Sequence, residues 1–142
     1  MYTINPYLTF DGTCAEAFDF YRSVFGGEFS MMQTFADAPP EMPVAPQDRD
    51  KVMHVSLPLG DDQVLMGSDV PSDQGPAGTG SAIAISIGPS SSEEGRRLFE
   101  GLAEGGAVLM AYEAQFWGSE YGMCIDRYGI TWMIDYALPQ EG

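Results

Sequence analysis

Few residues in this sequence have side chains suited to chemistry, and His54 is the first of them. It is the sole histidine among 142 residues. Because imidazole titrates near neutrality, His54 is a candidate hydrogen-bond donor or general base. The alternative is a half-buried strand histidine satisfied by a neighbouring carbonyl or carboxylate. One histidine makes no triad, and the sequence has neither a G-x-S-x-G elbow nor a G-x-x-x-x-G-K-[ST] phosphate loop.

The thiols and carboxylates provide few further candidates for catalytic side chains. Cys14 and Cys124 are the only cysteines and form no C-x-x-C motif, so we expect free, mostly buried thiols rather than a disulfide framework. Asp69 and Asp135 are the candidate catalytic carboxylates. Neither has a partner at a known distance, so the sequence predicts surface charges at both positions.

Large aromatic side chains and methionines are the candidates for ligand contact. Trp117, Tyr121 and Trp132 each offer an apolar face with a polar edge, which suits a ligand cavity and equally suits core packing. Strand methionines are usually filler, although a flexible thioether lining also accepts varied apolar ligands. The set comprises Met31, Met32, Met66, Met110, Met123 and Met133.

The charge narrows the range of partners. The formal net charge is -15, from 21 acidic and 6 basic residues. This balance argues against nucleic acid and anionic membrane surfaces. We interpret the negative charge as a feature that keeps the protein soluble. The alternative is an acidic pocket that binds a cationic ligand. No apolar run reaches the roughly 20 residues of a membrane helix, and the first ten residues do not resemble a signal peptide, so we expect a cytoplasmic protein.

The elements of the first half follow from periodicity. Alternation predicts a strand over 6–10, and apolar spacing predicts a helix over 14–25 with Thr13 and Glu16 as its capping pair and Gly26-Gly27 as its end. Further strands are predicted at 28–35, 52–59 and 63–68. The proline-rich residues 36–50 read as a long loop, either a lid or a disordered arm.

The same order returns in the second half, after a Gly- and Pro-rich linker over 71–80. A strand is predicted at 82–87, a serine-capped helix ends at Gly105-Gly106, and strands follow at 107–114, 122–126 and 131–136. The sequence therefore predicts one α+β domain over 1–142, built from two βαβββ units at 1–70 and 81–142.

With this repeat, the chain resembles the PhnB-like branch of the vicinal oxygen chelate superfamily, which includes glyoxalases, bleomycin resistance proteins and dioxygenases. The resemblance covers nearly the whole chain, and it implies that the mixed sheets of the two units curl to form a cavity. The residues that carry it are Pro6–Phe10, Ala17–Tyr21, Val24–Gly27, Met53-His54, Leu65–Asp69, Phe116–Gly118, Tyr121-Gly122 and Asp126–Trp132. PhnB-like proteins have often been labelled as relatives of a demethylubiquinone methyltransferase, but no glycine-rich nucleotide loop supports that activity here.

The resemblance also implies where a metal would bind. Metal-dependent members hold a divalent cation with His, Glu or Gln on the first and fourth strands of each unit. Here those positions fall on Pro6, Met66, Ala82 and Met133, which are unsuited to Zn²⁺, Ni²⁺ or Mg²⁺. A slip of one residue brings in Tyr7, Ser81 or Ser68, still without His or Glu. A like-placed Asp in the superfamily fixes the last hairpin, which implies that role for Asp126.

The sequence therefore predicts a small-molecule-binding protein without metal or other cofactor, which takes an apolar or aromatic ligand. The alternative is a metal-dependent lyase or dioxygenase of the glyoxalase type with displaced ligands. The expected ligand-binding residues are Tyr7, His54, Met66, Trp117, Tyr121, Trp132 and Met133, with His54 as the catalytic candidate. The resemblance further implies a homodimer.

Overall fold

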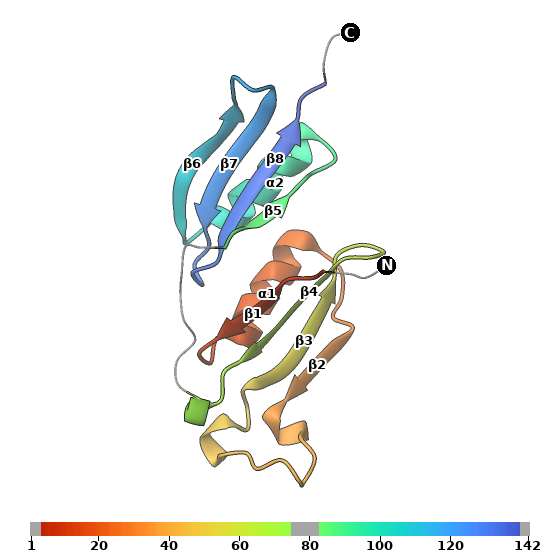
Figure 1. Ribbon diagram of the computed structural model, residues 1–142, viewed down its shortest axis with the longest axis vertical. Helices are drawn as coiled ribbons and strands as arrows, with labels where there is room; N and C mark the ends of the chain where they lie inside the picture. The colour runs from red at the N-terminus through yellow and green to blue at the C-terminus, as the bar shows by residue number, and fades with distance from the viewer. Residues whose placement is uncertain (1–3, 75–82, 140–142) are drawn as a thin grey trace. The chain divides into compact units, whose positions relative to one another are not determined.

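The computed structural model describes residues 4–74 and 83–139. The chain forms two compact units, Met1–Gly78 and Thr79–Gly142, which are described separately below. In each unit one helix lies against one face of a four-stranded sheet (Figure 1). The predicted α+β fold of two βαβββ units is confirmed.

Unit 1 has the strand order β1-β4-β3-β2, in which β1 runs parallel to β4 and the other pairs are antiparallel. Its first strand therefore pairs with its last, so the sheet depends on contacts between distant parts of the chain. The elements are β1 (Tyr7–Phe10), α1 (Cys14–Phe25), β2 (Met31–Thr34), β3 (Val52–Pro58) and β4 (Val64–Asp69).

The helix α1 has the predicted bounds and ends at Gly26, whose φ of 83° lies in the left-handed region that favours glycine. Its start differs from the prediction, because the Thr13 side chain makes no capping hydrogen bond. Instead, Asp69 Oδ1 accepts hydrogen bonds from the backbone amides of Gly12 (2.8 Å) and Cys14 (3.0 Å). Asp69 Oδ2 also accepts from the Val52 amide (2.9 Å). One carboxylate therefore joins β4, β3 and the start of α1.

The proline-rich segment 36–50 is more ordered than the sequence predicted. It holds parts of two short 3-10 helices, η1 (Phe35–Asp37) and η2 (Pro46–Asp48). The buried Asp48 carboxylate accepts hydrogen bonds from the Ser72 amide and hydroxyl and lies 2.9 Å from Lys51 Nζ. The Lys51 ammonium, assisted by Ser72, holds the pKa of Asp48 below its ordinary value. Residues 38–45 between the two short helices have no regular structure, as expected for a loop, and these bonds attach the end of the segment to neighbouring elements.

Unit 2 repeats the topology with the order β5-β8-β7-β6, in which β5 is parallel to β8. The predicted serine cap is confirmed, since Ser91 Oγ accepts a hydrogen bond from the Glu94 amide at 3.1 Å. The elements are β5 (Ile85–Ile87), α2 (Ser92–Ala103), β6 (Ala107–Ala114), β7 (Ser119–Ile125) and β8 (Thr131–Ala137).

Glycines mark the face of each sheet that the helix covers. A Cβ on Gly67 would lie 2.6 Å from Phe18 Cε1 of α1, and one on Gly122 would lie 2.9 Å from Phe99 Cε2 of α2. Because strand side chains alternate between faces, the neighbours of these glycines point away from the helices. Each unit thus has a buried helix-covered face and a second face that its own helix leaves open.

The region between the units is only partly described. The 3-10 helix η3 (Ser72–Gln74) lies inside the predicted 71–80 linker, whereas residues 75–80, Ser81 and Ala82 lie outside the described residues. Within the described residues, no helix is both long and apolar enough to cross a membrane.

Candidate functional site

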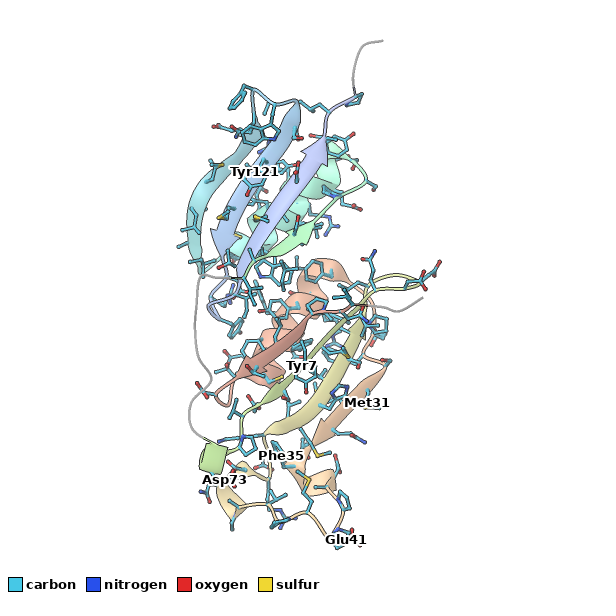
Figure 2. All side chains as sticks on the ribbon, in the orientation of Figure 1. Tyr7, Met31, Phe35, Glu41, Asp73 and Tyr121 are labelled. Atoms are coloured by element: carbon cyan, nitrogen blue, oxygen red, sulfur yellow. The ribbon has the colours of Figure 1, made fainter. Side chains whose placement is uncertain are left out.

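The open face of unit 1 carries three of the seven residues expected to bind a ligand, including the catalytic candidate His54. Tyr7 pairs with Met66 across β1 and β4, and Ser56 pairs with Met66 across β3 and β4. His54 shares the face of Ser56, two residues away, and pairs with Gln33 of β2. Figure 2 labels Tyr7 and Met31, two of the exposed side chains of this sheet. The predicted residues Tyr7, His54 and Met66 therefore lie on one surface.

His54 has two direct neighbours on that surface. Its Nε2 lies 3.1 Å from Ser56 Oγ, so the hydroxyl donates when the ring proton is on Nδ1 and accepts when it is on Nε2. The Tyr7 ring stacks on the imidazole, with centroids 5.9 Å apart and planes at 30°. This arrangement combines a flat aromatic surface with one hydrogen-bonding edge. Sequence reasoning missed Ser56, although the predicted strand over 52–59 places it two residues from His54 and therefore on the same face.

The observed register changes which residues occupy the superfamily's metal positions. Tyr7, rather than Pro6, is the strand partner of Met66, and Ser86 is the strand partner of Met133, whereas Ala82 lies outside the described residues. Neutral hydroxyls and thioethers are poor ligands for Zn²⁺, Mg²⁺ and similar ions. Among the described residues, moreover, no three His, Cys, Asp or Glu side chains gather as a cation site would require. The residues present do not fit the superfamily's metal.

The open face of unit 2 has a different character. Met110, Met123 and Met133 are consecutive cross-strand partners on β6, β7 and β8. Tyr121, labelled in Figure 2, lies on the same face with Glu113 as its partner on β6 and Asp135 as its partner on β8. The methionine row thus forms an adaptable apolar surface beside a second row, in which two carboxylates flank the Tyr121 ring.

The two tryptophans have separate environments. Trp117, 49% exposed, contacts the Tyr121 ring edge-on, with centroids 5.8 Å apart. Trp132, in contrast, is paired with Cys124 on the helix-covered face and is 1% exposed. Its indole N–H donates to Asp126 Oδ2 at 2.8 Å. Trp117 and Tyr121 are therefore available to a ligand, whereas Trp132 is part of the core.

The buried carboxylates are structural. Asp126 Oδ1 accepts hydrogen bonds from the Tyr128 (2.8 Å) and Ile130 (3.1 Å) amides, so its expected role in the last hairpin is confirmed. Asp69 is 3% exposed, and the expectation of a surface charge there was wrong. Its bonds to α1 and β3 require burial. Asp135 is exposed as predicted.

The thiols are free and buried, as the sequence predicted. Burial raises the pKa of Cys14 to about 12 and that of Cys124 to about 11, and the nearby Asp69 and Asp126 carboxylates raise them further. Because the thiolate is the nucleophile, neither cysteine is prepared for covalent chemistry near neutrality.

Comparison with known proteins identifies the family to which the chain belongs. A family model described as 3-demethylubiquinone-9 3-methyltransferase matches residues 2–135. The chain belongs to this family. A PhnB protein from Bacillus cereus has a similar structure, with 26% identity and a TM-score of 0.75 over 96% of this chain and all of the other. The PhnB-like resemblance inferred from the sequence is thus supported.

Two further relatives of this chain are more similar to it in sequence. Protein YjdN of Escherichia coli is 30% identical over 96% of this chain and 97% of its own length. The crystal structure of PA1353 from Pseudomonas aeruginosa is 38% identical, with a TM-score of 0.86 over 98% of this chain and all of that one. Glyoxalase-related and fosfomycin resistance structures match at 20% and 10% identity, a likeness that shows the fold alone.

Proposed function

We propose that this PhnB-like chain is a binding protein that takes an apolar or aromatic small molecule on an open sheet face without a metal. The observation that supports it is the stacking of Tyr7 on His54, with Ser56 at the imidazole edge. A flat ligand can contact the Tyr7 ring while its polar group reaches His54.

The character of the face supports an uncharged ligand at unit 1. Its paired residues include no Asp, Glu, Lys or Arg: they are Tyr7, Met66, Ser56, Met31, Gln33 and His54. An apolar body with one or two hydrogen-bonding groups is the best match. His54 then serves as a hydrogen-bond partner, or as a general base if the bound molecule carries an acidic proton.

The superfamily's metal chemistry receives no support from the donor set. Tyr7, Met66, Ser86 and Met133 occupy the relevant register positions, and none is an imidazole or carboxylate. No step of the proposal therefore depends on a Lewis acid.

The test is titration with 2-naphthol, an uncharged aromatic probe with one polar group, followed by calorimetry and NMR shifts of the His54 ring. Tyr7→Ala and His54→Ala should each weaken binding about tenfold. Leu59→Ala, which shortens an exposed side chain after β3, should leave the affinity unchanged. Equal affinities for wild type, Tyr7→Ala and His54→Ala would refute the site.

We also propose a homodimer. Edge strand β6 exposes Val108 (54%), Leu109 (52%) and Met110 (43%), an unusual number of apolar side chains for an unpaired sheet edge. Such an edge favours association with another protein surface.

A further inference from the structure

An exposed aromatic corner lies at the turn between β6 and β7. The Phe116 and Trp117 rings meet edge to face, with centroids 5.1 Å apart, and Trp117 in turn contacts Tyr121 at 5.8 Å. Phe116 is 96% exposed and Trp117 49% exposed. Exposed aromatic faces of this kind can attract cations through the negative potential of the ring.

Carboxylates flank the Tyr121 ring on both sides. Glu113 and Asp135 are its direct cross-strand partners, so their Cβ atoms lie about 5 Å from that of Tyr121 on the same face. Both side chains are exposed, and neither has a side-chain hydrogen bond or ion pair within the described part of the chain. Two unneutralised negative charges thus border the aromatic surface.

No Lys or Arg of the chain lies on a described strand. The six Lys and Arg residues all fall in helices, loops or turns: Arg22, Arg49, Lys51, Arg96, Arg97 and Arg127. Arg127, in the turn before β8, donates to the Glu104 carbonyl, and Arg96 lies over Tyr112 of the helix-covered face. The charge on the open face of unit 2 is therefore available to a ligand.

We propose that Glu113, Trp117, Tyr121 and Asp135, the aromatic–carboxylate site, bind a cationic nitrogen attached to an apolar body. The aromatic faces contact the cation, the carboxylates attract it, and the methionine row on Met110, Met123 and Met133 accepts the apolar part. An organic cation fits better than a metal ion, because the two carboxylates stand on opposite sides of Tyr121 rather than converging on a point. This inference rests on the proposed function, since it takes an open sheet face as the ligand surface.

The test compares choline with its uncharged isostere 3,3-dimethylbutan-1-ol by NMR of the full chain. Choline should shift the Trp117 indole signal and bind about tenfold more tightly than the isostere. The Trp132 indole, bonded to Asp126 in the core, serves as the internal reference and should not move. Equal affinities of the two probes, or no shift at Trp117, would overturn the proposal without the need for any variant.

Charge variants separate the site from the overall field of an acidic protein. Glu113→Gln with Asp135→Asn should weaken choline binding about tenfold and leave the isostere unchanged. Asp61→Asn with Asp62→Asn removes the same charge from the exposed turn after β3 and should leave choline binding unchanged. An equal loss in both double variants would overturn the proposal. If 2-naphthol still binds at Tyr7 and His54 while choline does not bind, only this inference fails; if neither probe binds, the proposed function fails with it.

Discussion

Asp69 and Cys14 are joined by a 3.0 Å hydrogen bond in which the backbone amide at the start of α1 donates to a carboxylate at the end of β4. Asp69→Ala leaves this amide and those of Gly12 and Val52 without their acceptor. Unfolding free energy should fall by about 3 kcal/mol, as measured in urea. Asp135→Ala, at an exposed position, should change it by less than about 0.5 kcal/mol. Similar losses in the two variants would contradict this role.

Gly67 should tolerate no larger residue, because its added Cβ would lie 2.6 Å from Phe18 and 2.8 Å from the Leu8 carbonyl. Gly67→Ala should therefore cost about 1–3 kcal/mol of unfolding free energy. Gly60→Ala is the matched control, since nothing lies within 4 Å of its added Cβ. A stable Gly67→Ala protein with an unchanged melting temperature would show that α1 packs differently.

The buried thiols should make stability depend on alkaline pH. Their folded pKa values, about 12 for Cys14 and about 11 for Cys124, exceed the ordinary value of 9.0, so the native state keeps protons that the unfolded chain loses. The contribution of the protonated thiols to the unfolding free energy is fully present below pH 9, and it is lost as pH rises toward these values. Urea unfolding at about pH 8 and about pH 10.5 measures this fall. A Cys14→Ala, Cys124→Ala variant should show a shallower fall, and an equally steep one would remove the thiols from the explanation.

The metal content of the purified chain tests whether the residues at the superfamily's metal positions bind a divalent cation. The purified chain should retain only substoichiometric nickel, zinc, iron or manganese after dialysis, because Tyr7, Met66, Ser86 and Met133 are unsuited to these ions. Elemental analysis of wild type and His54→Ala provides the measurement. One ion per chain in wild type, lost in His54→Ala, would establish a metal site of another composition.

The proposed homodimer predicts the sedimentation behaviour. The wild-type chain should sediment as a dimer at micromolar concentration, whereas Leu109→Lys should shift it toward the monomer by placing a charge on edge strand β6. Glu28→Gln, at an exposed position in the other unit, changes the net charge by the same single unit and should leave the dimer intact. A wild-type chain that sediments only as a monomer would refute the dimer.

Local signals predicted the elements well. The apolar spacing of α1, its glycine end and the Ser91 cap of α2 depend on residues close in sequence, and all are confirmed. The role of Asp69 could not be predicted in this way, because its partners at Gly12 and Cys14 lie 57 and 55 residues away. The sequence pattern instead favoured Thr13, which directly precedes the helix, as the capping residue.

The candidate site was harder to predict than the elements, because the face of the sheet on which a side chain lies depends on the register of its strand. A slip of one residue transfers every side chain to the other face, and this distinguishes Pro6 from Tyr7 as the partner of Met66. Trp132 and Met133 are adjacent in sequence but lie on opposite faces. Composition alone could name both as candidates; only the pairing of β7 with β8 separates them.

The pairing of first with last strands also sets an order of assembly during translation. β1 has its partner β4 only once Asp69 has left the ribosome, and β5 waits in the same way for β8. Since chains generally fold from the N-terminus as they emerge, unit 1 can close while unit 2 is still being made. Until then Leu8 and Phe10, which are buried in the folded unit, remain exposed to solvent. We expect a chaperone to bind the emerging chain at these two residues.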